Sequence, residues 1–113
     1  MENLSEMKCV PCRGGVPPLE KTRRIELHAQ IDNWHEIDGH HLSKTFSFGD
    51  FRSALDWVNR VGELAEEVGH HPDIYLSWGK VRLDIWTHKI DNLTESDFIF
   101  AAKVDALHTA SNT

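Results

Sequence analysis

Apolar residues recur along this chain with two different periods, and the two periods alternate. Between residues 50 and 68 the apolar side chains follow the 3.6-residue period of a helix that is buried along one stripe. They occupy positions 51, 54, 55, 58, 61, 64, 65 and 68. Asp50 can cap the start of this helix, and Gly69 can adopt the left-handed conformation that ends it. The sequence therefore predicts a long amphipathic helix that ends at Val68.

Four shorter segments show the two-residue period of strands that are buried on one side. They cover residues 33–38, 41–48, 73–78 and 80–88. The first two are joined at Asp38–Gly39, a dipeptide that tolerates the positive φ angles of a tight hairpin turn. The other two turn at Gly79, and Val81, Leu83 and Ile85 alternate there with residues of the opposite face. The pattern predicts two antiparallel hairpins.

Two further helices flank this pattern. The segment Leu19–Ile31 follows a pair of prolines, which suit a first helical turn, and carries apolar residues four positions apart. The last helix is predicted to start at Thr94 and to run to about Leu107. Thr94 and Asp97 have the spacing of a capping box, in which each residue satisfies a backbone group of the other.

The resulting order, α-β-β-α-β-β-α, predicts an α+β fold with a four-stranded antiparallel sheet and three helices packed on one face. We expect a single domain over residues 18–108, a flexible N-terminal arm over residues 1–17 and a frayed tail over residues 109–113. The core of a 113-residue chain is small and the sheet has open edges, so assembly with a second copy is favoured.

Composition excludes several classes of protein. A hydrophobic content of 40% and a charged content of 27% are typical of a folded domain and not of a disordered chain. The formal net charge of −6, without a cluster of Lys and Arg, argues against direct binding of nucleic acid. No apolar run approaches the ~20 residues that span a bilayer. Since the N-terminal segment also lacks the pattern of a signal peptide, we expect no membrane partner and a cytoplasmic location.

The two cysteines, Cys9 and Cys12, stand in the stretch CVPC of the arm. Such a pair can be a redox centre or half of a zinc site. The chain has no second cysteine pair, and no strand–helix unit of the thioredoxin kind follows the motif. A reduced pair in the arm is the favoured interpretation, with metal binding and redox chemistry as the alternatives.

Candidate chemistry is concentrated just after the long helix, in the stretch EEVGHHPDIYLSW. Glu66 and His70 are four residues apart, so a helix that reaches Gly69 would place them on one face, where the carboxylate can accept the imidazole N–H. His71 lies beyond the helix end and must point elsewhere, and Pro72 favours an extended conformation for it. We expect two imidazoles that point apart from a rigid corner.

A third histidine, His88, is predicted to lie at the same corner. Alternation along the second hairpin puts it off the core face, and antiparallel pairing brings it and Thr87 close to His71. Asp97 follows in the first turn of the last helix. Each residue alone has an ordinary structural interpretation, such as capping for Asp97 or a solvated charge for Glu66. The convergence of three histidines is what indicates a functional site.

Two kinds of chemistry fit such a cluster. The first is general acid–base catalysis, because imidazoles titrate near neutral pH. The second is a metal site with three imidazole ligands. Metal-binding histidines on helices are usually four residues apart, whereas adjacent histidines point apart, so acid–base chemistry ranks first. We interpret His40 and His41 as solvated hairpin residues, and His28, His35 and His108 show no pattern of use.

The combination of residues around the corner resembles the pterin-4a-carbinolamine dehydratase family. The pattern of that family is an acidic residue, three spacers, His-His-Pro, an aromatic residue, a histidine after a strand and a downstream aspartate. The matching residues are Glu66, His70, His71, Pro72, Trp78, His88 and Asp97. The resemblance extends over roughly residues 19–108, the region around Trp34 included.

The resemblance implies the same α+β fold, a homodimer or homotetramer, and a reaction that needs no metal or organic cofactor. That reaction is the dehydration of 4a-hydroxytetrahydropterin to quinonoid dihydropterin, during recycling of the pterin cofactor of aromatic amino-acid hydroxylases. His70 and His88 would be acid–base residues on the two faces of the ring, His71 would hold the pterin and share the proton transfer, and Glu66 and Asp97 would be supporting carboxylates. The implied substrate contacts are His70, His71, Pro72, Trp34, Trp78, Thr87 and His88.

The chain departs from the family in two places. Gly69 stands where some relatives have an acidic or amide residue, and the leader KCVPCRGG is absent from the best-known animal members. Animal members of the family also bind a homeodomain transcription factor as a dimerisation cofactor. A non-catalytic dimerisation or binding module, or a pterin-binding accessory protein, is therefore the alternative to an enzyme.

Overall fold

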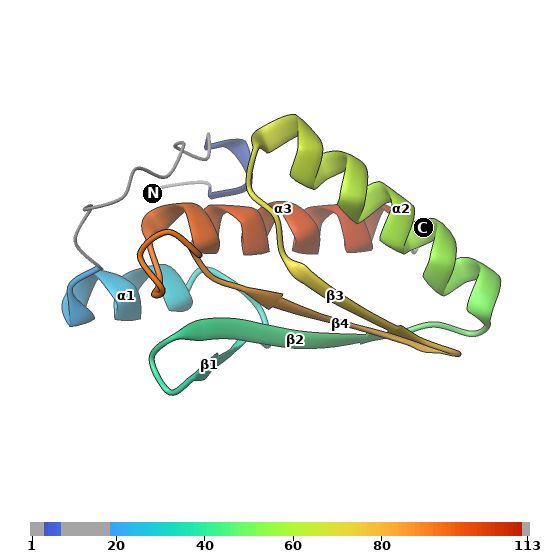
Figure 1. Cartoon of the computed structure of the whole chain (residues 1–113), viewed down its shortest axis with the longest axis horizontal. Coiled ribbons are helices and arrows are strands. Elements are labelled where there is room, and N and C mark those ends of the chain that lie inside the picture. Colours follow the sequence, from blue (N-terminus) through green and yellow to red (C-terminus); the bar gives the residue numbers. More distant parts are fainter. Residues whose placement is uncertain (1–3, 8–18, 112–113) are drawn as a thin grey trace.

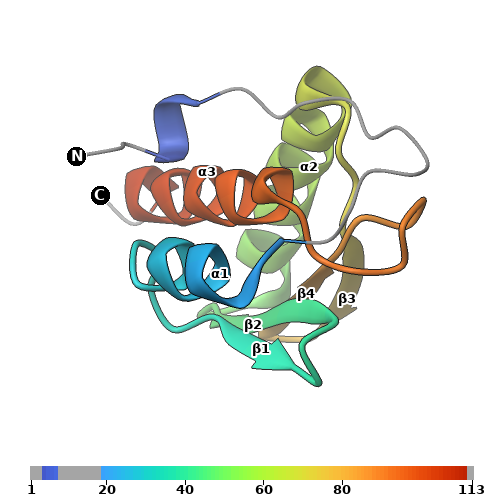
Figure 2. The same ribbon diagram turned by 90° about the vertical axis from the view of Figure 1, so that its left-hand side faces the viewer.

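The computed structural model describes residues 4–7 and 19–111 of the chain, and these form one layer of helices on one antiparallel sheet (Figures 1 and 2). The elements are η1 (Leu4–Glu6), α1 (Lys21–His28), β1 (His35–Ile37), β2 (His41–Ser47), α2 (Phe51–Val68), β3 (Asp73–Ser77), β4 (Lys80–Ile85) and α3 (Glu95–Ser111). The strands are ordered β1-β2-β4-β3, and every neighbouring pair is antiparallel. The predicted α+β fold and the order α-β-β-α-β-β-α are confirmed.

Alternation along the strands separates the two faces of the sheet. Leu42 and Phe46 of β2 and the apolar positions of β4 are buried beneath the helices, as their two-residue period predicts. The stripe of α2 contributes Ala54, Trp57, Val61 and Ala65 to the same core. The core therefore lies between the helices and one face of the sheet, and the other face carries mainly polar side chains such as Ser43 and Arg82.

Both ends of α2 are fixed by the residues that the sequence indicates. The carboxylate of Asp50 accepts a hydrogen bond from the backbone N–H of Ser53 at 2.7 Å. Gly69 has φ 71°, and its N–H donates to the carbonyl of Ala65 at 2.9 Å. Because the left-handed conformation is accessible to glycine at little cost, the chain leaves the helix sharply here. The exit at Gly69 sets the direction of the two histidines that follow.

Several boundaries differ from the prediction. Strand β4 ends at Ile85 and not at residue 88, because Thr87 pairs with Asn92 in an isolated bridge that closes a short loop. Helix α1 is shorter than the predicted 19–31, and α3 continues to Ser111, into the predicted tail.

Most of the predicted N-terminal arm, with its CVPC motif, lies outside the described residues. Residues 4–7 are described, and they lie against α3. Leu4 is buried there, and the Lys103 ammonium donates to the Ser5 carbonyl at 2.8 Å.

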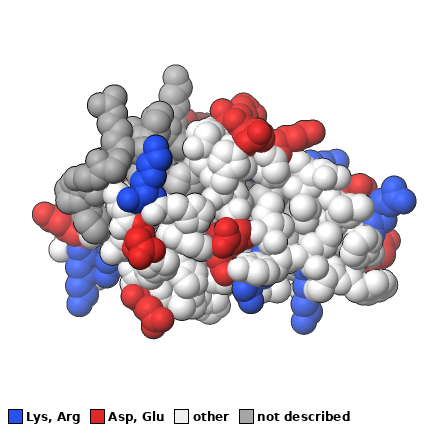
Figure 3. All heavy atoms as spheres, in the orientation of Figure 1, with Lys and Arg blue, Asp and Glu red and all other residues white. Residues whose placement is uncertain are grey.

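Charged side chains are mixed on the molecular face shown in Figure 3, where Lys and Arg lie among Asp and Glu without forming a continuous basic surface. None of the helices within the described ranges is both long and apolar enough to cross a bilayer.

Candidate functional site: a pocket lined by three histidines

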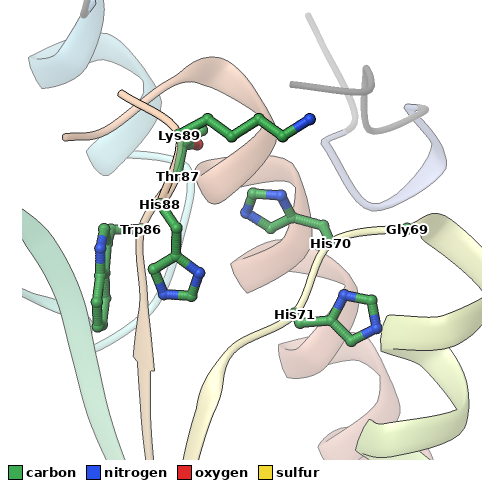
Figure 4. Close-up of a pocket in the computed structure, with 7 residues that line it drawn as sticks. All are labelled: Gly69, His70, His71, Trp86, Thr87, His88 and Lys89. Atoms are coloured by element: carbon green, nitrogen blue, oxygen red, sulfur yellow. The ribbon is translucent and has the colours of Figure 1, made fainter. Parts of the chain in front are cut away.

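A pocket of about 290 Å³ opens where the chain leaves α2 and where β4 ends (Figure 4). Its lining residues are Gly69, His70, His71, Trp86, Thr87, His88 and Lys89. In Figure 4 His70 and His71 project from one side, and Trp86 and His88 stand on the other. The predicted convergence of the three histidines is therefore confirmed. The convergence depends on the register of β3 and β4. Asp73 pairs with Asp84, so the residues that precede Asp73 and those that follow Asp84 lie at the same end of the hairpin and lead into the pocket walls.

His70 is the buried histidine of the pocket. Its ring nitrogen Nε2 lies 2.6 Å from Oδ1 of Asp97, and the exposed fractions of the two side chains are 8% and 0%. Since a carboxylate oxygen accepts, Nε2 carries the proton, and Nδ1 is the nitrogen that is not bound to Asp97. This contact fixes both the orientation and the tautomer of the His70 ring.

Both carboxylate oxygens of Asp97 accept hydrogen bonds. While Oδ1 accepts from His70, Oδ2 accepts from the Thr87 hydroxyl at 2.8 Å and from the Thr94 backbone N–H at 2.7 Å. The bond from Thr94 is the capping contact that the sequence predicts. Asp97 thus caps α3 and holds His70 at the same time, and the two interpretations of this residue are compatible.

Glu66 pairs with His71, and the prediction that it would pair with His70 is wrong. The Glu66 carboxylate accepts from Nε2 of His71, and both side chains are more than half exposed. The reason is the left-handed residue Gly69, after which position 70 no longer lies on the helix face that carries Glu66. His70 turns inward, and His71 reaches back over the last turn of α2.

His88 has a looser environment than His70. Its Nε2 lies 4.0 Å from Oδ1 of Asp73, which is too long for a hydrogen bond, and its side chain is about half exposed. The firmer contact is with Trp86, whose ring centroid is 4.4 Å away at an interplanar angle of 87°. His88 is therefore placed mainly by packing on an aromatic edge or face.

Three predicted substrate contacts do not line the pocket of their own chain. Trp34 is buried in the core, and its indole N–H donates to both carboxylate oxygens of Asp105 at 3.0 Å. Trp78 lies in the turn between β3 and β4, at the other end of the hairpin, and is 68% exposed. Pro72 follows His71 but is not a lining residue. Thr87 does line the pocket, as predicted.

Trp86 and Lys89 line the pocket and were missed at the sequence level. The alternation that put His88 off the core face also puts Trp86 there, so the signal was present for that residue. The interpretation of His40 and His41 as solvated hairpin residues is also wrong. Both are half-buried, and their ring centroids lie 5.4 and 5.7 Å from that of Trp86.

Metal-ligand geometry is not found in the part of the chain that the structure covers, where no three His, Cys, Asp or Glu side chains are grouped to hold an ion. Cys9 and Cys12 lie outside that part. The described pocket is instead built from imidazoles that are each directed by a neighbour: Asp97 for His70, Glu66 for His71 and Trp86 for His88.

The fold and the pocket define a small α+β protein with an imidazole-lined pocket at a helix–strand junction. The sequence profile of the family described as pterin 4 alpha carbinolamine dehydratase matches residues 17–107. The chain belongs to this family, whose members are hydro-lyases by name.

Individual relatives extend this similarity over nearly the whole chain. A protein from Rubrobacter xylanophilus that carries the name of the family is 58% identical over 107 residues, which are 95% of this chain and 100% of the relative. A protein of the same name from Alkaliphilus metalliredigens is 52% identical over 106 residues, which are 93% of this chain and 96% of the relative.

Two solved structures share the fold. The crystal structure of a transcriptional coactivator/pterin dehydratase from Brucella melitensis has a TM-score of 0.75 at 27% identity, and the match covers 80% of this chain and 98% of that one. A pterin dehydratase-like protein identified as a RuBisCO assembly factor in the alpha-carboxysome has a TM-score of 0.59 at 31% identity. That match covers 67% of this chain and 89% of the other.

Proposed function

We propose that this protein dehydrates 4a-hydroxytetrahydropterin to quinonoid dihydropterin and water, by acid–base catalysis from histidines and without a metal or organic cofactor. The observation that carries the proposal is the pocket in which His70 and His71 stand opposite His88 (Figure 4). Membership of the dehydratase family supports it.

The reaction needs two proton transfers. The leaving 4a-hydroxyl must receive a proton, and N5 of the ring must lose one. We assign these transfers to His70 and His88, which stand on opposite walls, while His71 holds the pterin and shares the transfer. Positioned acid–base groups of this kind each contribute ~10²–10⁴-fold to a rate.

The carboxylates have supporting roles in this proposal. Asp97 fixes the tautomer and the orientation of the His70 ring, because its Oδ1 accepts from Nε2 at 2.6 Å. Glu66 orients His71 at the pocket rim, where both side chains are exposed and solvent screens their interaction.

We further propose that the working form is a homodimer or homotetramer in the cytoplasm, where the protein takes part in pterin recycling. Trp78 is exposed and remote from the pocket of its own chain, so a contact between Trp78 and substrate would require a second chain. Trp34 is assigned to the core, because Asp105 already binds its polar group.

A non-catalytic role is the second candidate. The names of the two structural neighbours support this candidate, because one is called a transcriptional coactivator/pterin dehydratase and the other a RuBisCO assembly factor.

The deciding experiment is an assay of the metal-free protein on enzymatically generated 4a-hydroxytetrahydropterin, followed by ultraviolet absorbance. We expect the wild type to accelerate loss of the intermediate, and His70→Ala and His88→Ala to be slower by ~10²-fold or more. His35→Ala is the matched control, because His35 is exposed on β1 and does not line the pocket. Wild-type protein that is no faster than buffer would refute the proposal and favour the binding role.

A further inference from the structure

A second group of side chains lies beside the pocket and has no part in the proton transfers proposed above. It consists of His40, His41, Trp86 and Asp91. Trp86 forms one wall of the pocket (Figure 4). The rings of His40 and His41 contact the same indole as His88 does, but neither of them lines the pocket.

The hydrogen bonds within this group form a chain in which each histidine donates to the next residue. Nε2 of His40 lies 2.7 Å from Oδ1 of Asp91, and because the carboxylate accepts, Nε2 carries the proton. In the neutral ring Nδ1 is then an acceptor, and it lies 3.1 Å from Nδ1 of His41. His41 therefore donates to His40, which donates to Asp91.

Asp91 belongs to the loop that carries His88. The Thr87–Asn92 bridge closes this loop, with Thr87 N–H donating to the Asn92 carbonyl at 3.0 Å. Asp91 has φ 52°, a left-handed conformation that is uncommon for a residue with a side chain. The bond from His40 thus connects the turn between β1 and β2 to the loop that bears a pocket histidine.

We propose that His40 is a positioning residue for His88. It acts through its hydrogen bond to Asp91, which restrains the loop that carries His88, and through its contact with Trp86, the indole on which His88 packs. His70 is held by a carboxylate, whereas the carboxylate beside His88 is 4.0 Å away, so His88 depends on this indirect support. The inference deepens the proposed dehydratase function and rests on it for its catalytic consequence.

The test uses His40→Phe, which keeps an aromatic ring beside Trp86 but cannot bond to Asp91. His35→Phe is the matched control, since it adds the same ring at an exposed histidine of the same hairpin. Two kinds of measurement are made: steady-state kinetics, which give kcat and KM for dehydration, and nuclear magnetic resonance of the His70 and His88 imidazoles. We expect kcat to fall by about threefold to tenfold with little change in KM, because small displacements of a catalytic group lower the rate.

The nuclear magnetic resonance signals separate positioning from a general loss of structure. In His40→Phe the His88 signals should shift or broaden while those of His70 stay in place, and His35→Phe should change neither. His88 signals that match the wild type would overturn the inference. If the wild-type protein shows no dehydratase activity, the proposed function fails, while the His88 signals still decide whether His40 positions that residue.

Asp91→Gly provides a second, independent measurement. Glycine accepts the left-handed conformation at this position without strain, so the substitution removes the carboxylate and not the turn. If His40 and Asp91 act as one unit, the double variant with His40→Phe should displace the His88 signals no further than the larger of the single effects. Additive displacements would show that the two residues act separately and would overturn the inference.

Discussion

His70 and Asp97 are joined by a buried hydrogen bond of 2.6 Å, although they are 27 residues apart in the chain. His70 belongs to the exit from α2, and Asp97 to the first turn of α3. The bond therefore connects two helices through the wall of the pocket. Because neither side chain is accessible to much solvent, loss of one partner leaves the other with an unmet hydrogen-bonding requirement.

Substitution of Asp97 by Asn should lower both stability and activity. Hydrogen bonds reach both carboxylate oxygens, whereas an asparagine side chain has one oxygen and would place an N–H against a donor. We expect the free energy of unfolding to fall by ~1.5–3 kcal/mol, as for a bond to a charged group. Denaturant unfolding and the dehydration assay measure the two effects.

Asp84→Asn is the matched control for this variant. Asp84 is also buried and accepts from Ser43 and Arg82, but it does not line the pocket. It should lose stability without a loss of kcat, whereas Asp97→Asn should lose roughly tenfold or more in kcat. Equal kcat values in the two variants would contradict a role for Asp97 in orienting His70.

Substitution of Glu66 by Gln should change activity without changing stability. Glu66 and His71 form an exposed pair, which contributes little to folding, so the free energy of unfolding should stay within ~0.5 kcal/mol of the wild type. The dehydration rate should fall severalfold if the carboxylate supports His71. Glu67→Gln, at the neighbouring exposed position, is the comparison, and an identical rate in both variants would remove Glu66 from the site.

Gly69→Ala should destabilise the fold and displace the two histidines that follow. The reason is the φ of 71°, since steric crowding does not arise: a Cβ at this position would meet nothing within 4 Å. The left-handed conformation costs an alanine ~1–2 kcal/mol. Gly62→Ala is the control, because Gly62 lies inside α2 with equal space around it and should gain ~0.5–1 kcal/mol in helix stability. If Gly69→Ala has the same free energy of unfolding as the wild type, a side chain at position 69 does not strain the end of α2, and the prediction is wrong.

His108 should make stability depend on pH. Burial lowers the pKa of His108 below its ordinary value of 6.5, the Lys44 ammonium lowers it further, and Asp105 opposes them. The folded state therefore binds the proton less readily than the unfolded state, so stability is complete above about pH 6.5 and is lost as pH falls through the lowered pKa. His108→Phe retains a ring in the cluster with Phe46 and Trp57. Urea unfolding between about pH 5 and 8 should show a smaller pH dependence in this variant, and an unchanged dependence would exclude His108 as its source.

Local pattern was sufficient for most of the fold. The stripe of α2, the caps at Asp50 and Gly69 and the turn at Asp38–Gly39 depend on neighbouring residues, and the structure has them where the sequence predicts them. The same holds for His88, because a two-residue period and a hairpin turn set its side of the sheet and bring it to His71. Helical and strand periods are properties of a few consecutive residues, so one sequence can reveal them.

The partners of the histidines were decided by tertiary structure. The four-residue spacing alone favoured a hydrogen bond between Glu66 and His70. The left-handed turn at Gly69 redirects the chain, so that His70 bonds to Asp97 and Glu66 bonds to His71. Nor could spacing assign His40 to Asp91, since the two residues meet only after β1, β2 and β4 have assembled. The sequence by itself therefore brought the three histidines and Thr87 to the pocket, but it did not identify Trp86 and Lys89 as lining residues. The direction of a chain after a helix end, and the contacts between distant loops, depend on packing across the whole domain, and these determined how each imidazole is held.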